Sequence, residues 1–311
     1  MKAAVCTKYG PPEVLQIMEV AKPLAKNNEI CIKIRATAVT ASDCIVRGFS
    51  IPFWKPMGFM MGLVVGFKKP RQPILGIVFA GEVESLGGNV TVFKRGDNVF
   101  GWDLFPGFGG YAQYKCIAES SMVALKPGNM NFEGAAALPY GGLLALSLVN
   151  RSNIKSGQNV LIYGASGAIG TMAVQLAKYS GANVTGVCST GNLGLVRSLG
   201  ADAVIDYTKE DTVKSGVFYD LIIDAVGKNK GSKLKLQCKK SLSSGGRYIS
   251  IDDGRPKNDI EDLNLLKELA EAGSLKPVID RIYPLEQIVG AHKYTDMGHK
   301  KGNVIISVGH D

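Results

Sequence analysis

The sequence predicts a two-domain α/β protein, in which a β-rich N-terminal domain precedes a doubly wound parallel sheet covered by helices. Three observations support this fold class. The chain has 311 residues, which is more than one compact core usually accommodates. Short strand-like segments crowd residues 1–126, whereas apolar strands and helical segments alternate after Asn131. A glycine-rich turn, GASGAIG at residues 164–170, joins the first of these apolar strands to a helix.

Composition narrows the classes of partner. Hydrophobic residues make up 46% and charged residues 20% of the chain, so a large core can form and a disordered chain is excluded. The formal net charge of +9 favours anionic ligands or acidic membrane surfaces. The longest basic runs are only pairs, at 68–69, 239–240 and 300–301. Because no basic motif is interleaved with aromatic residues, we expect no nucleic-acid partner.

The cysteines and the N-terminus indicate a cytoplasmic protein. The six cysteines are far apart and form no CxxC pair, so the spacing typical of zinc sites is absent and we expect buried, reduced thiols. The opening MKAAVCTKYG is typical of a strand and not of a signal peptide. The most apolar stretch, residues 57–67, has about half the length of a bilayer-crossing helix.

The first domain, residues 1–126, is expected to bind the substrate. EICIKIRATAV at 29–39 alternates as a half-buried strand does, and PILGIVFAGEVESLG at 73–87 is a second apolar run. RGDNVFGW and GGYAQYKCIAES follow, each bounded by turn residues. Short strands at this spacing predict a small barrel or sandwich.

An apolar segment lies between the first two strands, at residues 48–73. Its sequence is GFSIPFWKPMGFMMGLVVGFKKPRQP, and its prolines and glycines are too frequent for one long helix. Two interpretations remain open. The segment is either a loop packed on its own core or an apolar lid over a hydrophobic substrate, because mobile loops on a rigid scaffold often contribute binding residues.

Residues 127–273 form the expected second domain. A helix begins after Asn131, a plausible N-cap. Continuous apolar strands then alternate with helices, which predicts a parallel sheet. The five expected strands are residues 160–163, 184–188, 203–206, 221–226 and 248–251. The helix that ends at Gly273 leaves no residues for a sixth strand, and the final GNVIISV of segment 274–311 is expected to return to the first domain.

The glycine turn predicts a dinucleotide site. Gly164 ends a strand, Gly167 places no side chain between backbone and pyrophosphate, and Gly170 lets the following helix lie close to the strand. The N–H groups and the positive dipole end of that helix point at the turn, where an anion is stabilised. We therefore expect a bound nucleotide cofactor.

The end of the next strand favours NADPH over NADH. Residues 188–192 read Cys-Ser-Thr-Gly-Asn and lack the acid that usually binds the ribose hydroxyls of NAD. The hydroxyls of Ser189 and Thr190 would accept a 2′-phosphate, although no Arg or Lys stands in this turn. Tyr207, after the third strand, either stacks on adenine and contacts the phosphate or is a surface tyrosine.

The chain resembles a known family, the zinc-independent quinone oxidoreductase branch of the medium-chain dehydrogenase/reductase superfamily. The resemblance covers nearly the whole length and rests on ATAVTASD (36–43), AGEVESLG (80–87), FKRGDNVFG (93–101), AAALPYGGLLAL (135–146), GASGAIGTMAVQLAK (164–178), LGADAVIDY (199–207) and GHKKGNVIISV (298–308). It implies a GroES-like substrate domain, a Rossmann domain, and NADPH-dependent reduction of quinones or α,β-unsaturated carbonyls.

The resemblance also implies cofactor contacts, residue by residue. Around the pyrophosphate it places Ser166, Ala168 and Ile169, beside Gly164 and Gly167 of the turn, and near the 2′-phosphate Ser189 and Tyr207 beside Thr190. Along the cofactor it places Ala225, Val226 and Ser250, and closing over it His299, Lys301, Gly302 and Asn303. Lys301 would then supply the positive charge that is missing beside Thr190.

Departures from the family pattern argue against a metal and against the usual dimer. Zinc-dependent relatives have cysteine at Thr40, Gly-His-Glu at residues 76–78 and a four-cysteine lobe, and this chain has none of these. A zinc alcohol dehydrogenase is therefore nearly excluded. Many relatives have a longer segment after the fifth strand that pairs subunits, so we expect a monomer or a non-standard dimer.

The candidate catalytic residues are three hydroxyl donors. A reduced quinone or enone leaves an oxyanion, to which the hydroxyls of Thr40, Ser42 and Tyr140 could donate, although local backbone bonding is an equally simple role for them. Asp43 is expected to cap a helix, and His292 and His310 are expected at the surface. The alternative function is an NADPH-binding redox-sensing or membrane-surface protein with little turnover, which the net charge and residues 53–67 favour.

Overall fold

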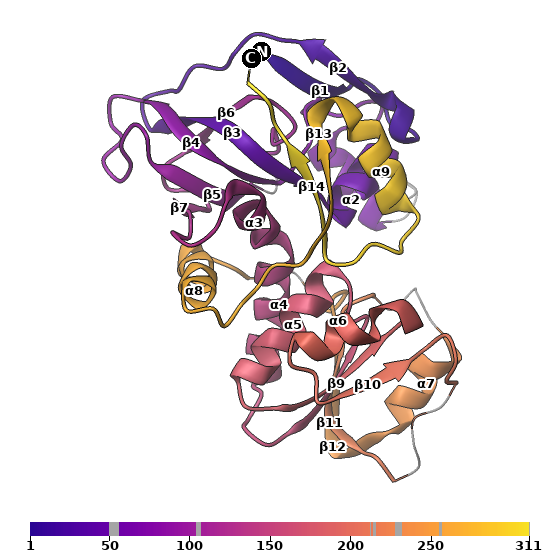
Figure 1. The fold of residues 1–311 in the computed structure, drawn as a ribbon. Coiled ribbons are helices and arrows are strands. Elements are labelled where there is room, and N and C mark those ends of the chain that lie inside the picture. The colour runs from indigo at the N-terminus through magenta and orange to yellow at the C-terminus, as the bar shows by residue number, and fades with distance from the viewer. Residues whose placement is uncertain are drawn as a thin grey trace. The chain divides into compact units, whose positions relative to one another are not determined.

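The chain folds into two compact units. The structure, a computed structural model, describes residues 1–49, 56–103, 107–211, 213, 216–227, 232–254 and 257–310. The first unit comprises Met1–Pro139 and Ile279–Asp311, and the second comprises Tyr140–Val278 (Figure 1). The first boundary lies beyond the expected residue 126 because helix α3 (Phe132–Ala137) packs on strands of the first unit. Asn131 caps α3 through its side chain, as expected.

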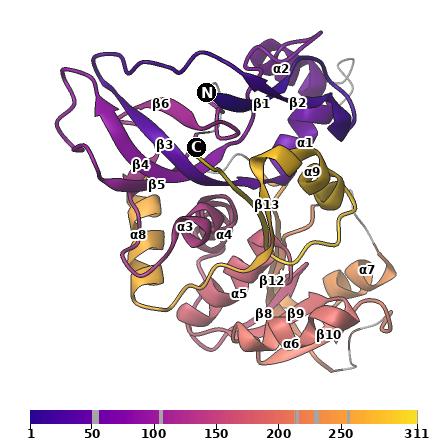
Figure 2. The same ribbon diagram turned by 45° about the horizontal axis from the view of Figure 1, so that its top comes forward.

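The described strands of the first unit form two sheets. Its strands are β1 (Lys2–Cys6), β2 (Leu15–Glu19), β3 (Glu29–Val39), β4 (Val78–Leu86), β5 (Asn98–Trp102), β6 (Tyr114–Ala118), β7 (Val123–Leu125), β13 (Ile279–Pro284) and β14 (Asn303–Ser307). β1 and β2 pair with each other (Figure 2). The described strands of the larger sheet follow the order β13-β14-β3-β4-β5-β7, with β6 also paired to β3.

β3 is the centre of the larger sheet. Ile30, Ile32 and Ile34 are fully buried, as their alternation predicted. β14 runs antiparallel to β3, with Val304 opposite Val39. Through this pairing and that of β13 with β14, the C-terminal segment adds two strands to the larger sheet of the first unit.

Short helices complete the first unit. They are η1 (Pro12–Val14), α1 (Ala41–Gly48), α2 (Pro56–Val65), η3 (Leu285–Gln287) and α9 (Ile288–Asp296), besides α3. α2 occupies ten residues of the apolar segment 48–73, where prolines and glycines argued only against a long helix. Residues 50–55 of that segment lie outside the described residues.

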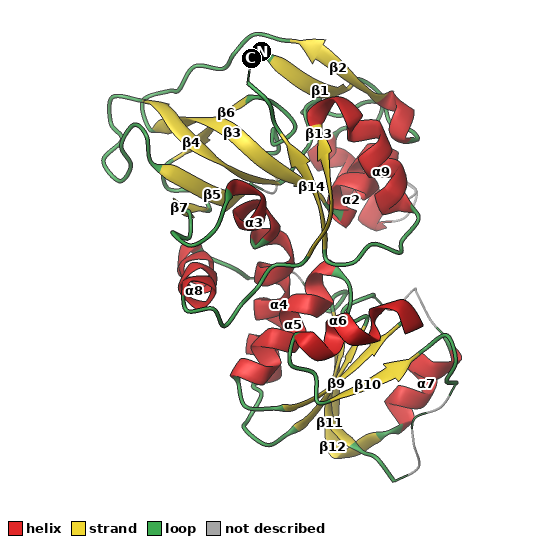
Figure 3. Cartoon of the chain, in the orientation of Figure 1, coloured by secondary structure: helices red, strands yellow, loops and turns green. Residues whose placement is uncertain are grey.

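The second unit contains the predicted parallel sheet. Its strands are β8 (Asn159–Tyr163), β9 (Asn183–Cys188), β10 (Ala203–Asp206), β11 (Tyr219–Asp224) and β12 (Leu242–Ser250). They follow the order β10-β9-β8-β11-β12, and every neighbouring pair is parallel (Figure 3). The helices are α4 (Pro139–Ser152), α5 (Ala168–Tyr179), η2 (Thr190–Asn192), α6 (Leu193–Ser198), α7 (Lys233–Lys240) and α8 (Ile260–Glu271).

Two strand ends of this sheet differ from the prediction. β11 stops at Asp224 and not at Val226, because the Asp224 carboxylate accepts the backbone N–H groups of Val226 and Gly227 and turns the chain. β12 begins at Leu242, earlier than expected, since pairing with β11 overrides the weak strand propensity of its serines and glycines. In the described part of the second unit, the sheet has no sixth strand.

The expectation that His292 and His310 are surface residues is wrong. His292, on α9, is fully buried, because this helix turns it towards α1, where Arg47 Nη1 donates to its Nδ1 across 3.1 Å. The ring also meets Tyr111 edge to face at 5.5 Å. His310 is half-buried, and its Nε2 lies 2.6 Å from the carbonyl oxygen of Ile34.

Composition also led to expectations about the cysteines and about membrane-crossing helices. All six cysteines are free thiols, four of them buried. Among the described helices, none combines the length and the apolar character needed to cross a bilayer.

Candidate cofactor site

The carboxyl ends of five parallel strands gather most of the predicted cofactor residues at one edge of the second unit's sheet. In doubly wound sheets this edge binds the ligand. After β8 lie Gly164 and Ser166–Ile169, after β9 Ser189 and Thr190, after β10 Tyr207, after β11 Ala225 and Val226, and at the end of β12 Ser250.

The glycine turn is held tightly against the sheet. Gly164 has φ +83, a left-handed conformation that favours glycine. The backbone N–H groups of Gly164 and Ala165 both donate to the carbonyl of Val187 on β9, at 3.1 and 2.9 Å. A Cβ on Gly170 would overlap the carbonyl oxygen of Gly164. The close approach of α5 to β8 therefore requires glycine at position 170, as the sequence indicated.

Gly167 has a different role, because the chain itself does not fill the space in front of it. It is the N-cap of α5 with extended backbone (φ −80, ψ 174), and no side chain caps the helix. A Cβ built on Gly167 would meet one atom within van der Waals range, the Gly164 carbonyl oxygen at 3.6 Å. An uncapped helix N-terminus behind an unfilled approach fits a pyrophosphate, since the helix dipole stabilises anions there.

Asn192 is a residue of this site that sequence reasoning missed. It closes η2 after β9 and is 7% exposed. Its Nδ2 donates to the hydroxyl oxygens of Ser166 and Ser189, each at 3.1 Å. Its Oδ1 is buried without a hydrogen-bond partner in the described part of the chain. Asn192 thus ties the glycine turn to the turn after β9, and no pattern in the sequence reveals its burial.

An acid lies under the turn after β9, although residues 188–192 contain none. Asp206, the last residue of β10, accepts from the Thr190 hydroxyl at 2.5 Å and from the Thr208 hydroxyl at 2.6 Å. Burial opposes the charge of this carboxylate, but those hydroxyls outweigh burial and lower the pKa of Asp206. The carboxylate is therefore ionised at neutral pH. Tyr207, the next residue, is 42% exposed.

A buried ion pair supports the turn after β11. Asp224 is fully buried, and its Oδ2 lies 2.6 Å from Nζ of Lys235 on α7. The Tyr248 hydroxyl donates to the same oxygen at 2.5 Å. The other oxygen accepts from the N–H groups of Val226 and Gly227, at 3.1 and 3.2 Å. The backbone of the predicted cofactor residues Ala225 and Val226 is thereby fixed by a charge behind it.

Ser250 and Tyr248 belong to the same cluster on β12. The Ser250 hydroxyl lies 3.4 Å from Asp224 Oδ2, and its backbone N–H donates to Asp253 at 2.8 Å. Burial, reinforced by the hydrogen bond to Asp224, raises the pKa of Tyr248. Both hydroxyls therefore remain protonated donors to the carboxylate at neutral pH.

Thr40 lies in the first unit and already has a local role. It is the N-cap of α1 and 2% exposed. Its hydroxyl accepts from the Asp43 N–H at 3.2 Å, and its backbone N–H donates to Asp43 Oδ2 at 2.9 Å, so the two residues form a capping box and Asp43 helps to cap the helix, as expected. The Thr40 hydroxyl also donates to Asp43 Oδ2 at 2.6 Å. Burial raises the pKa of Asp43 to about 6. Ser42, on the first turn of α1, is half-buried.

The C-terminal residues of the predicted site adjoin Thr40. Since Val304 pairs with Val39, Gly302 and Asn303 lie beside the end of β3. Asn303 is buried, whereas His299 and Lys301 are exposed. Tyr140, the third predicted hydroxyl donor, is buried on α4 in the second unit.

Lys300 is a further residue that sequence reasoning missed. Burial lowers its pKa to about 8, and its Nζ donates to the carbonyl oxygen of Gly302 at 2.5 Å. Its neighbour Lys301 is anchored through its backbone N–H, which donates to Asp280 at 2.9 Å.

The positions that bind zinc in related enzymes lack ligands. Thr40 and residues 76–78 contain no Cys, His, Asp or Glu. Across the described ranges, no group of three or more His, Cys, Asp and Glu side chains is arranged to hold a metal ion.

Comparisons with known proteins agree with this architecture. Residues 26–127 match the family model of the alcohol dehydrogenase GroES-like domain, and residues 168–275 and 254–306 match two models of zinc-binding dehydrogenases. The chain is 32% identical to a 2-methylene-furan-3-one reductase of Solanum lycopersicum, over 98% of this chain and 79% of that protein.

Two further relatives extend the likeness. An NADPH-dependent alkenal/one oxidoreductase of Arabidopsis thaliana is 30% identical, over 98% of this chain and 79% of that protein. Among solved structures, the quinone oxidoreductase from Coxiella burnetii superposes with a TM-score of 0.85 at 29% identity, covering 99% of both chains.

Proposed function

Because the chain belongs to the quinone oxidoreductase branch of the medium-chain dehydrogenase/reductase superfamily, we propose that it reduces quinones or α,β-unsaturated carbonyls with NADPH and without a metal. That it is an enzyme, an oxidoreductase using a nicotinamide cofactor, follows from its relatives. The cofactor and substrate class named here go further and rest on the residues of the site.

The open N-terminus of α5 is the observation that supports cofactor binding. The nicotinamide cofactor supplies the hydride, so the protein's task is to bind, orient and exclude water. The N–H groups that follow Gly167 would hold the pyrophosphate, and Asn192 keeps Ser166 and Ser189 in register behind it. The Asp224 cluster fixes the backbone of Val226, along which the cofactor would lie.

NADPH is favoured because the turn after β9, residues 188–192, contains no carboxylate to bind a ribose. An acid that selects NAD must accept hydrogen bonds from the ribose hydroxyls. Both Asp206 oxygens already accept from the Thr190 and Thr208 hydroxyls. The turn at 188–192 offers hydroxyls instead, from Ser189 and Thr190.

The hydroxyls of Thr40, Ser42 and Tyr140 remain our proposed donors to the oxyanion left by hydride transfer. Thr40 would have to exchange its bond to Asp43 for one to the substrate. Metal-free chemistry suits quinones and enones, which accept hydride without the Lewis acid that alcohol oxidation requires.

A glycine substitution tests the cofactor site. Gly167→Val should abolish NADPH binding in a fluorescence titration while leaving the fold intact, because a Cβ there meets only the Gly164 carbonyl oxygen at contact distance. Gly88→Val is the matched control, since a Cβ at Gly88 meets nothing within 4 Å. Unchanged NADPH affinity in Gly167→Val would refute the phosphate role of this turn.

A substrate panel tests the reaction. NADPH oxidation should proceed with quinones and alkenals and not with simple ketones, and elemental analysis should find no stoichiometric zinc. Turnover of ketones by a zinc-loaded protein would contradict the proposal.

Sedimentation tests the oligomeric state and should show a monomer or a dimer of unusual interface. An edge-to-edge dimer through β12 would contradict this expected interface.

The alternative function is that of a cofactor-binding protein with little turnover, which senses redox state or acts at a membrane surface. Tight NADPH binding without turnover of any panel compound would favour this alternative. The observation that supports a membrane contact is the exposed apolar face of α2.

A further inference from the structure

α2 is apolar on every side but is not buried on every side. Its sequence, PMGFMMGLVV, contains no charged or polar side chain. A surface helix normally combines an apolar stripe with a polar face, and a helix that is apolar all round belongs in a core or a membrane. Gly58, Gly62 and Val65 are buried. The opposite side is exposed, so no described part of the chain covers the apolar face that its composition would normally bury.

The exposed side chains form one continuous surface, which we term the α2 patch. Its members are Phe59 (52% exposed), Met60 (51%), Leu63 (44%), Val64 (43%) and Phe67 (42%). The rings of Phe59 and Phe67 lie 5.6 Å apart between centroids. A Cβ on Gly62 would overlap the Phe67 ring, so the absence of a side chain there lets Phe67 lie across the helix. Contiguous exposed apolar surface of this kind marks an interaction site.

Positive charge follows the patch directly. Lys68, Lys69 and Arg71 are exposed, and no carboxylate pairs with any of them in the described parts of the chain. The sequence from 44 to 81 contains five basic residues and no Asp or Glu. The patch is therefore followed by Lys68, Lys69 and Arg71, three exposed cations that no carboxylate of the described residues pairs.

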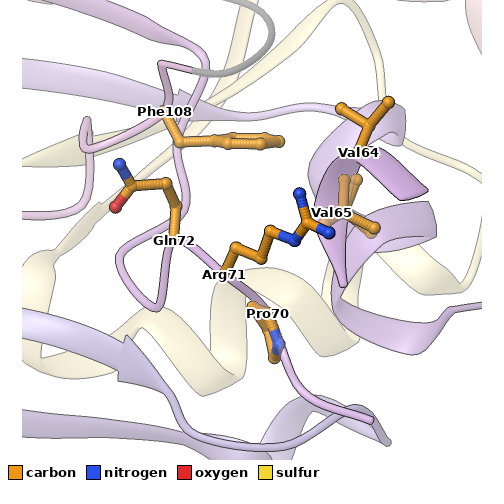
Figure 4. Close-up of a pocket in the computed structure, with 7 residues that line it drawn as sticks. Val64, Val65, Pro70, Arg71, Gln72 and Phe108 are labelled. Atoms are coloured by element: carbon orange, nitrogen blue, oxygen red, sulfur yellow. The ribbon is translucent and has the colours of Figure 1, made fainter. Parts of the chain in front are cut away.

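A small cavity lies against α2 (Figure 4). Its volume is about 180 Å³, and it is lined by Val46, Val64, Val65, Pro70, Arg71, Gln72 and Phe108. Figure 4 shows the Arg71 side chain extending towards Val65, with the Phe108 ring on the other side of the space. The lining of this cavity thus combines hydrocarbon groups with a guanidinium group.

We propose that the α2 patch and Lys68, Lys69 and Arg71 dock this protein on the surface of a bilayer that contains anionic phospholipids. The apolar side chains would enter the acyl boundary, the basic side chains would meet lipid phosphates, and the cavity beside Arg71 would admit part of one lipid. The ten residues of α2 span about 15 Å, half of the hydrocarbon core, so the helix lies on the bilayer and does not cross it.

The charge pattern favours a bilayer over a second copy of the chain. In a two-fold dimer the same patch meets itself, which would bring Lys68 and Lys69 of one copy close to those of the other. An anionic bilayer instead complements both the hydrocarbon and the cations. The docking does not require turnover, so its failure is distinguishable from failure of the proposed reaction.

Vesicle binding tests the proposal. The protein is sedimented with vesicles of phosphatidylcholine alone and with vesicles in which part of that lipid is replaced by phosphatidylserine. Binding is expected to the second kind and to fall sharply from about 0.1 M to about 1 M salt, where charges are screened within about 3 Å. Equal binding to both kinds of vesicle, or to neither, would overturn the proposal.

Matched variants separate the surface from bulk charge. Because each basic residue near an anionic surface strengthens binding about fivefold, K68E/K69E should weaken it by at least about 25-fold. K94E/R95E changes the net charge equally at another exposed pair of the first unit and should bind nearly as wild type. Equal losses in both variants would show a non-specific charge effect and refute the docking surface.

The apolar part is tested in the same way. F59S/L63S should lose vesicle binding, whereas L24S/V92S, at side chains 84% and 70% exposed, should retain it. Melting temperatures confirm that each variant is folded. If F59S/L63S instead raises only the KM for quinones, or dissociates a dimer, while vesicle binding is unchanged, the patch is a substrate lid or a self-association surface and the membrane proposal is wrong.

Discussion

Asn192 donates a hydrogen bond from its Nδ2 to the Ser166 hydroxyl across 3.1 Å, and thereby joins two turns from neighbouring strands. Ser166 lies in the glycine turn after β8, and Asn192 closes the turn after β9. A second bond of the same length reaches Ser189. The proposed pyrophosphate and 2′-phosphate contacts are thus held in fixed relation before any ligand arrives.

Removing that amide should weaken cofactor binding. Asn192→Ala deletes two hydrogen bonds, and a typical net value of about 1 kcal/mol for positioning predicts roughly a fivefold to tenfold higher Kd for NADPH. Fluorescence titration measures the change. Asn150→Ala, at an exposed asparagine of α4, is the control, and equal Kd values for the two variants would dismiss the linking role of Asn192.

Breaking the Asp224–Lys235 pair should destabilise the second unit. Lys235→Met leaves a buried carboxylate without its counter-charge, which costs about 3–5 kcal/mol of unfolding free energy in comparable cases. Denaturant unfolding measures it. D224N/K235M removes the charge and should recover part of the loss. Lys178→Met, in a partly exposed pair with Asp202, should cost less than about 1 kcal/mol. Similar losses for K235M and K178M would contradict the burial argument.

Neutralising Asp206 should sharpen the preference for NADPH. Its carboxylate touches Thr190 at 2.5 Å, so it repels a phosphate bound at that turn. Asp206→Asn should raise the ratio of NADPH to NADH affinity by roughly three- to tenfold, because it removes the charge that repels the phosphate. Asp202→Asn, an exposed carboxylate of the same unit, controls for net charge. An unchanged ratio in Asp206→Asn would place the ribose phosphate elsewhere.

The burial of His292 makes the stability of the first unit depend on pH. Burial, with Arg47 nearby, lowers the pKa of His292 to about 3, against about 6.5 in an unfolded chain. At pH values between these two pKa values, the unfolded state binds more protons than the native state. The contribution of His292 to the unfolding free energy is therefore complete above about pH 6.5 and is lost as the pH drops towards 3. His292→Gln should flatten this fall, as thermal melts across that range would show. A surface histidine would give parallel curves for variant and wild type.

Ionisation of Asp43 should make the stability of the first unit depend on pH in the opposite direction to that of His292. Burial raises its pKa to about 6, above the value of about 3.9 for an unfolded chain. The native state therefore binds the extra proton, and this contribution to stability is complete at low pH and lost as the pH rises from about 4 to about 6. Asp43→Asn should remove this opposing slope. The same melts, recorded for both single variants, separate the two contributions, and a wild-type slope in Asp43→Asn would exclude this ionisation.

Local signals in the sequence were sufficient for the second unit's sheet and for the glycine turn. Continuous apolar strands and a helix after GASGAIG are properties of adjacent residues, so they can be recognised without a structure. The capping role of Asp43 was anticipated for the same reason, because its partner Thr40 is three residues away, whereas Thr40 itself was not recognised as the N-cap.

Most of the missed features depend on contacts between residues that lie on different elements. The partner that buries His292 is Arg47, 245 positions earlier, and only packing decides which face of α9 meets α1. Lys235 pairs with Asp224 across a strand-to-helix connection. The burial of Asn192 results from its reach to Ser166 on another strand. No periodicity within ten or twenty residues encodes such contacts.

Gly170 and Gly167, both in the turn before α5, are constrained for different reasons. Gly170 presses against the backbone of Gly164, so a mutation there is caught by quality control of the nascent protein. Gly167 faces nothing of the chain's own beyond ordinary contact, so a mutant at that position would fold, accumulate and evade proteolysis. Selection for glycine at position 167 would therefore act through cofactor binding and not through folding. A lineage that no longer needed the cofactor would lose Gly167 first and keep Gly170.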